Sequence, residues 1–174
     1  MTQVDAEANH AIPELAPPLP RFLCDEMLAQ LGRWLRAAGY DTVIARDRTN
    51  DRALVARAIA DRRVLLTRDR KLCEIRDACD CVVLLPEGNI ADLVAEVSKR
   101  FSVDWLARPF SRCLVCNTEL RPAPPLARER LPAGVREQGD AINHCRQCDR
   151  LYWPGGHVRR MTDKLARWRA GRFA

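Results

Sequence analysis

The chain has 174 residues, enough for one ordinary domain or two small ones, and a net charge of +6. The excess charge lies in residues 111–174, where 13 Lys and Arg stand against 6 Asp and Glu, and it indicates either an anionic partner or a solubilising face. No stretch approaches the roughly 18 apolar residues of a membrane span, and residues 1–20 lack the basic start and apolar core of a signal peptide, so we expect a cytoplasmic protein without a membrane partner. The absence of Gly-x-Gly-x-x-Gly and Gly-Lys-Ser/Thr loops argues against a nucleotide cofactor.

An alternating pattern organises the first two thirds of the chain. Residues 1–20 are rich in proline and alanine and contain no Lys or Arg, which predicts a disordered tail. From Arg21 onward, short apolar runs alternate with segments of helical spacing. The predicted strands are 21–24, 42–45, 64–67 and 81–85, and the predicted helices are 27–38, 50–61, 70–76 and 90–101. This order predicts an α/β domain over residues 21–108, with a parallel sheet and right-handed crossovers.

The first two of these helices each have one apolar face. In the first, Met27 and Trp34 are expected to face the core, whereas Arg33 and Arg36 face away from it. In the second, the spacing turns Ile59 inward.

Four of the eight cysteines form two Cys-x-x-Cys pairs, Cys113 with Cys116 and Cys145 with Cys148. Each such turn presents two thiolates to one tetrahedral ion, and Zn²⁺, at about 2.3 Å from sulfur, suits them. Four thiolates leave no open position, so we expect a structural zinc ion, a redox pair being the alternative. Residues 109–174 are thus predicted to form a zinc ribbon that ends in a basic helix over 158–172. The remaining cysteines lack this spacing and are interpreted as structural: Cys24, Cys73, Cys79 and Cys81.

Acidic residues follow three of the predicted strands. Asp25 and Glu26 come directly after the first strand, Asp47 and Asp69 follow the second and third after one arginine each, and Asp51 opens the second helix. Because the carboxyl ends of parallel strands meet at one edge of a sheet, we expect these carboxylates to converge. Such an oxygen-rich site selects Mg²⁺ or Mn²⁺, which supports phosphodiester cleavage. Asp is also a common helix cap, and for Asp51 both interpretations stay open.

Several of these runs resemble the Mut-seven C-terminal RNase domain family. The resemblance is carried by FLCDEML at 22–28, LGRWLR at 31–36, GYDT at 39–42, LLTRDR at 65–70 and FSRCLVCN at 110–117. It continues through Tyr152-Trp153, Gly156-His157 and Met161, and covers about residues 21–161 with order and spacing kept. It implies a PIN-like nuclease domain fused to a zinc ribbon, acting on RNA with a divalent metal. Carried across, the catalytic acids are Asp25, Asp69 and Asp51, with Asp25 and Asp69 as Mg²⁺ or Mn²⁺ ligands and Glu26 and Asp47 as helpers.

Basic and aromatic residues are candidate RNA contacts. Those selected are Arg33, Arg46, Arg68, Arg70, His157, Arg159 and Arg160. Arg46, Arg68 and Arg70 are expected to flank the acids, where they bind a phosphate or pair with the acids themselves. Tyr152 and Trp153 either stack on a base or pack within the ribbon.

Two other functions compete with a nuclease. One is a non-catalytic RNA- or ribosome-binding protein that acts through the ribbon and its basic helix. The other is a receiver-like phosphoacceptor, which normally needs a lysine after a late strand; the residues after Leu85 are Pro-Glu-Gly-Asn.

Overall fold

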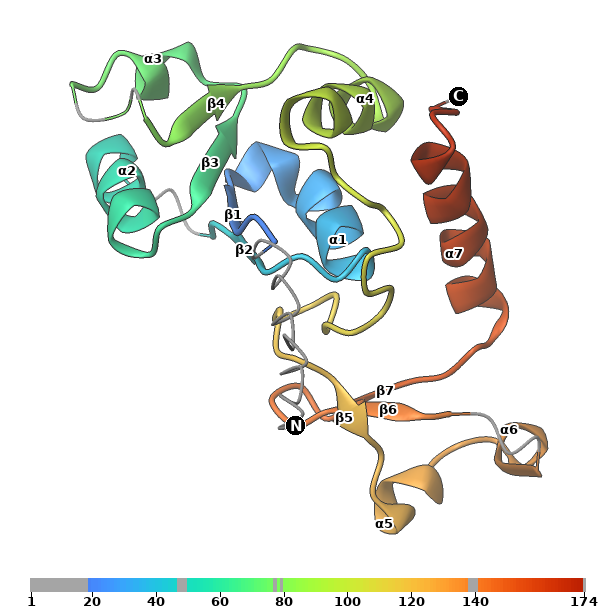
Figure 1. The fold of residues 1–174 in the computed structure, drawn as a ribbon. Coiled ribbons are helices and arrows are strands. Elements are labelled where there is room, and N and C mark those ends of the chain that lie inside the picture. Colours follow the sequence, from blue (N-terminus) through green and yellow to red (C-terminus); the bar gives the residue numbers. More distant parts are fainter. Residues whose placement is uncertain (1–18, 47–49, 77, 79, 138–140, 174) are drawn as a thin grey trace, which may run out of the picture.

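The computed structural model describes residues 19–46, 50–76, 78, 80–137 and 141–173 (Figure 1). The predictions for the tail up to residue 18, for Asp47 and for Cys79 lie outside the described residues.

The predicted parallel sheet is confirmed. Its four strands are β1 (Phe22–Cys24), β2 (Thr42–Ile44), β3 (Val64–Thr67) and β4 (Val82–Leu84). They pair in the order β2-β1-β3-β4, and every pair is parallel. All four therefore end at the same edge of the sheet.

Helices cover both faces of this sheet (Figure 1). They are α1 (Ala29–Ala37), α2 (Asp51–Ala60), α3 (Arg70–Cys73) and α4 (Ile90–Phe101). Since side chains alternate along a strand, Phe22 and Cys24 pack with α1 and α4, whereas Leu23 packs with α2 and α3. At Gly32, α1 comes so close to β2 that an added Cβ would lie 2.6 Å from Cγ1 of Ile44.

Three side chains lie where helical spacing did not place them. Met27 is 63% exposed, because Asp25 caps a single 3-10 turn, η1 (Glu26–Leu28), and the α-helix begins only at Ala29. Ile59 is 48% exposed, because Leu54, Val55 and Ala58 fill the buried face of α2. Arg36 is only 4% exposed, because the Cys113–Cys116 loop covers it.

A second, antiparallel sheet carries the cysteines. Its strands are β5 (Arg121–Pro122), β6 (Asn143–Cys145) and β7 (Arg150–Tyr152), in the order β5-β6-β7. Two short helices, α5 (Pro125–Arg128) and α6 (Ala133–Glu137), lie between β5 and β6. Together with the four-cysteine cluster described below, this arrangement is that of a zinc ribbon.

The last helix, α7 (Gly156–Arg169), runs back from the ribbon to the α/β part (Figure 1). Trp168 packs edge-on against Trp34 and Trp105, with ring centroids 4.7 and 5.2 Å apart. Leu165 and Trp168 thereby join the same apolar core as Phe22. The helix ends three residues before the predicted limit, since Gly171 turns the chain with a φ of 72°.

Along the described part of the chain, no helix combines the length and the apolar character that a membrane crossing requires.

Candidate functional site

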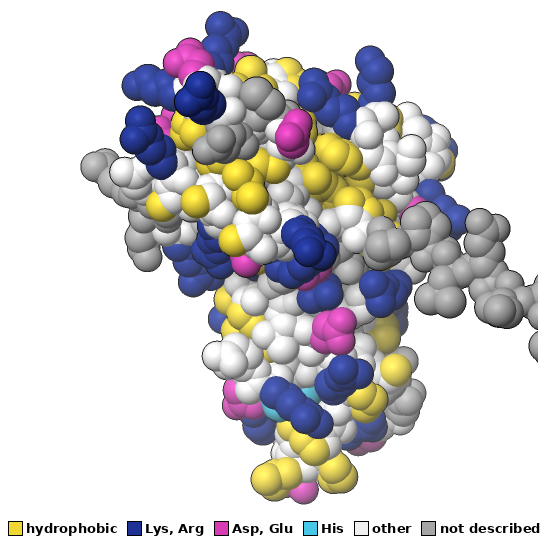
Figure 2. All heavy atoms as spheres, turned by 60° about the vertical axis from the view of Figure 1, so that its left-hand side comes forward, with side chains coloured by type: hydrophobic (Ala, Val, Ile, Leu, Met, Phe, Trp, Pro, Cys, Tyr) yellow, Lys and Arg dark blue, Asp and Glu magenta, His cyan; other side chains and the backbone are white. Residues whose placement is uncertain are grey.

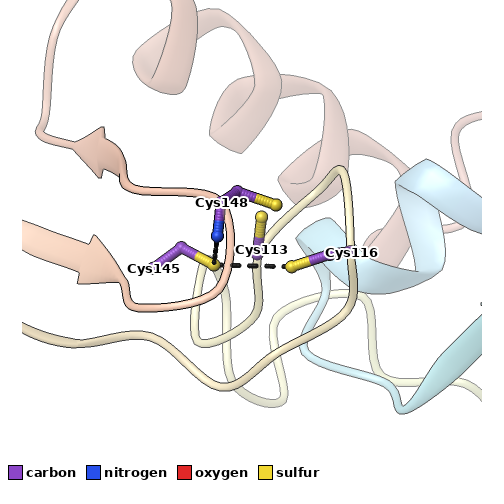
Figure 3. Close-up of side chains that lie close together, drawn as sticks. All are labelled: Cys113, Cys116, Cys145 and Cys148. Carbon is purple, nitrogen blue, oxygen red and sulfur yellow. Dashed lines mark hydrogen bonds between the residues drawn. The ribbon is translucent and has the colours of Figure 1, made fainter.

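Two similar turns bring the four predicted zinc ligands together (Figure 3). In each turn the residue after the second cysteine, Asn117 or Asp149, has a left-handed backbone with φ of 71° or 55°. The ligand atoms of the four cysteines all lie within 4.8 Å of one another. Within the described residues, no other group of three or more His, Cys, Asp or Glu residues meets that limit.

The electrostatics of the cluster favour a cation once its thiols ionise. Neighbouring thiols, the Cys116 thiol first, raise the pKa of Cys148 to about 12. Burial raises the pKa of Cys116, but hydrogen bonds with Thr118 and Cys148 outweigh it and bring that pKa to about 6. Four thiols this close cannot all ionise without a compensating charge, and Zn²⁺ supplies that charge. The donor set therefore fits a zinc ion held by protein sulfur alone.

Two polar side chains, Arg36 and Asn117, connect the α/β part to the Cys113–Cys116 turn. Arg36 donates to the carbonyl oxygens of Leu114 and Val115, at 3.0 and 2.8 Å, and to that of Thr42 at 2.7 Å. Asn117 accepts from the Thr42 amide at 3.0 Å and donates to Asp41 at 2.7 Å. Burial lowers the pKa of Arg36, while the thiols of Cys24, Cys113 and Cys116 act in the opposite direction.

A cavity of about 490 Å³ opens at the carboxyl edge of the parallel sheet, and we call it the acid cavity. Four of the five predicted acids line it: Asp25, Glu26, Asp51 and Asp69. Asp25 directly follows β1, Asp69 is the second residue after β3, and Asp51 opens α2. The shared edge of the sheet explains why residues so distant in sequence line one cavity.

Thr67, the last residue of β3, links the two central acids. Its hydroxyl donates to Oδ2 of Asp25 at 2.9 Å and accepts from the backbone N–H of Asp69, also at 2.9 Å. Because Thr67 is fully buried, these two hydrogen bonds fix the Asp25 carboxylate relative to the start of α3. Sequence reasoning missed Thr67, although it opens the Thr-Arg-Asp run at 67–69 and its β-branched side chain suits a strand end.

The same acids also cap local structure. Asp25 accepts from the Glu26 amide at 2.6 Å, and Asp69 accepts from the Lys71 amide at 2.9 Å. For α2 the capping residue is Asn50, which accepts from the Arg52 amide, so Asp51 is the first helical residue rather than the cap. Asp92 likewise has a capping role, since it forms a capping box with Asn89 at the start of α4.

The predicted basic contacts are spread over several surfaces. Arg46 lines the acid cavity and donates to the Val115 carbonyl oxygen at 3.3 Å. Arg68 and Arg70 line a different cavity, of about 330 Å³, where Arg68 pairs with Glu87 at 3.7 Å and donates to the carbonyl oxygen of Gly88. Adjacent residues at a strand end point in opposite directions, which separates Arg68 from Asp69.

The other basic candidates lie toward and on the ribbon. Arg33 lines a cavity of about 320 Å³ between the α/β part and the Cys113–Cys116 loop. His157 lines one of about 460 Å³ on the ribbon, together with Tyr152 and Trp153. Arg159 and Arg160 are exposed near the start of α7. In Figure 2, Lys and Arg side chains gather where the wide upper part meets the narrow lower part, and again around a histidine on the lower part.

Comparison with known proteins gives one result. Residues 20–165 match the model of the Mut7-C RNAse domain family. Neither the curated proteins nor the solved structures contain a match.

Proposed function

Because this chain belongs to the Mut7-C RNAse domain family, we propose that it is a metal-dependent ribonuclease that hydrolyses RNA phosphodiester bonds in the acid cavity. The family model is that of an RNase domain, which indicates a nuclease-like function and RNA as the substrate. The observation that carries the proposal is the link from the Asp25 carboxylate through the Thr67 hydroxyl to the backbone N–H of Asp69, on the wall of a cavity that Glu26 and Asp51 also line.

The side chains of the cavity fit a hard divalent cation. All four acids offer carboxylate oxygen, the donor that Mg²⁺ and Mn²⁺ prefer. No three of the described acids lie within the 4.8 Å limit that the cysteines meet, and Mg²⁺ needs no such cage because it keeps several water molecules. When bound, such an ion would activate a water molecule and stabilise the leaving oxygen.

We assign the roles of the residues from their positions. Asp25 and Asp69 would hold the cation, and Thr67 orients Asp25. Glu26 and Asp51, both exposed, are available to accept a proton from the attacking water. Arg46 lines the same cavity and is within reach of the scissile phosphate.

The test is cleavage of end-labelled single-stranded RNA by purified protein with Mn²⁺ or Mg²⁺. We expect Asp25→Asn and Asp69→Asn each to lower the rate by at least about 100-fold. Thr67→Val should lower it by about 10-fold or more, whereas Thr67→Ser, which keeps the hydroxyl, should stay near wild type. Asp92→Asn is the matched control, since Asp92 caps α4 and does not line the cavity. Cleavage at the wild-type rate by both Asp25→Asn and Asp69→Asn would refute the proposal.

A non-catalytic RNA- or ribosome-binding role is the second candidate. It is favoured by the capping bonds of Asp25 and Asp69, which give both residues a structural reason to be acidic. It is also favoured by the positive charge of residues 111–174. This candidate requires RNA binding that depends on salt and is unchanged by Asp25→Asn, by Asp69→Asn and by removal of Mg²⁺, without any cleavage.

A further inference from the structure

The acid cavity has one neighbouring cavity, which itself neighbours a third. Its neighbour, the 320 Å³ cavity that contains Arg33, shares Glu26, Ala45 and Arg46 with it, and we call this neighbour the junction cavity. The junction cavity in turn shares Leu114 and Val115 with the 460 Å³ cavity on the zinc ribbon, the ribbon cavity. The three cavities therefore follow one another from the carboxyl edge of the sheet to the ribbon, and we call this series the groove.

The charge along this groove changes from acidic to basic. Beyond the acids, Arg46 and Arg33 line the junction cavity, and Arg150 and His157 line the ribbon cavity. The one acid in the ribbon cavity, Asp149, is neutralised by Arg130 at 2.7 Å and lies 2.8 Å from the His144 ring. A phosphate backbone that leaves the acid cavity thus meets basic side chains in both the junction cavity and the ribbon cavity.

Trp153 gives the ribbon cavity an aromatic wall. Of the two aromatic residues there, Tyr152 is committed to the ribbon, because its hydroxyl accepts from the Leu114 amide at 3.0 Å and lies 3.2 Å from the Cys113 sulfur. Trp153 packs against a small apolar cluster but is only half-buried. A Cβ at Gly155 would lie 2.8 Å from the indole nitrogen, so the backbone there holds the ring closely.

From these observations we propose that the groove binds single-stranded RNA, with a phosphate backbone along Arg46, Arg33 and Arg150 and an unpaired base stacked on Trp153. This inference rests on the proposed function only for the fate of the strand in the acid cavity. A base inside a strand can stack on an indole only when it is unpaired, so the geometry favours single strands over duplexes. The zinc ribbon then forms part of the substrate-binding surface.

The test measures binding of fluorescent RNA in the absence of added Mg²⁺ and Mn²⁺, so that cleavage does not interfere. Affinity should rise with the length of a single strand until the groove is filled, and a duplex of the same sequence should bind more weakly. Trp153→Ala should weaken binding by about 10-fold, and Trp153→Phe, which keeps an aromatic face, by no more than about 3-fold. Arg33→Met and Arg150→Met should each reduce the salt dependence of binding by about one ion.

Arg57→Met is the matched control. This substitution removes the same charge outside the groove, because Arg57 lies on α2 and pairs with Asp61. Zinc content and circular dichroism establish that each variant is folded. The inference is overturned if Trp153→Ala and Trp153→Phe both bind as wild type, if a duplex binds as tightly as a single strand, or if an acidic peptide displaces RNA at equal concentration.

Binding and cleavage separate this inference from the proposed function. If the wild-type protein never cleaves RNA, but the Trp153→Ala variant binds RNA more weakly than wild type, the nuclease proposal fails and the groove proposal stands. If wild type cleaves with Mn²⁺ while folded Trp153→Ala matches its binding and its rate, the groove fails and the nuclease stands.

Discussion

Replacing Arg36 with methionine is expected to loosen the attachment of the zinc ribbon to the α/β part. The guanidinium group donates three hydrogen bonds of 2.7 to 3.0 Å, one to β2 and two to the Cys113–Cys116 loop. Methionine keeps most of the apolar stem and removes all three donors. A hydrogen bond from a charged group contributes about 1.5–3 kcal/mol, but the guanidinium also gives up its hydration when buried, so we expect a net loss of about 3 kcal/mol.

Urea unfolding measures this loss. With a typical dependence of about 2 kcal/mol per molar urea, the unfolding midpoint should fall by about 1.5 M. Arg33→Met is the control on the same helix: Arg33 is exposed and donates to the Ala29 carbonyl oxygen at 3.3 Å, so its effect should stay within about 0.5 kcal/mol. Equal midpoints for the two variants would refute the assignment of Arg36 as the anchor. Arg36→Lys should recover little, because one ammonium group cannot reach three acceptors.

Two further predictions concern the cation and the pH dependence of stability. Cys148→Ser should reduce bound zinc, measured with a colorimetric chelator, and lower the melting temperature. Cys73→Ser is the control and should change neither quantity, because Cys73 is exposed and lies outside the cluster. Zinc at the wild-type level in Cys148→Ser would contradict the assignment. Burial raises the pKa of Asp41, but hydrogen bonds from Arg63 and Asn117 outweigh it, so the folded-state pKa lies well below the ordinary 3.8. The resulting stabilisation is complete above about pH 4 and is lost as the pH falls toward the folded-state pKa. Between pH 5 and pH 3, wild type should therefore lose more unfolding free energy than Asp41→Asn, and parallel losses would exclude Asp41 as the cause.

Local pattern was sufficient for the parallel sheet and for the four-cysteine cluster that fits a zinc site. Each strand is a short apolar run, and buried parallel strands need little else to be recognised. Carboxylates at the ends of parallel strands necessarily share an edge, which is why Asp25 and Asp69 could be expected to lie together before any coordinates were known. The two Cys-x-x-Cys motifs are equally local, because both cysteines of each pair lie within one turn of the chain.

Features that depend on distant segments were beyond local pattern. Arg36 falls on the polar side of its helix, and it is buried because the Cys113–Cys116 loop, which includes Leu114 78 residues later, covers it. Arg68 and Asp69 are neighbours in sequence, yet they line different cavities. The link from Asp25 to Thr67 depends on how β1 pairs with β3, a pairing that neither strand encodes alone.

The return of α7 to the first helix has a consequence for synthesis on the ribosome. Trp34 and Trp105 are made before Trp168, which packs against both. Until Trp168 is made, the nascent chain carries an unfinished hydrophobic surface, the kind that chaperones recognise and that promotes aggregation. We therefore expect zinc depletion during expression to drive this protein into inclusion bodies, because an unfolded ribbon cannot position α7 against the core.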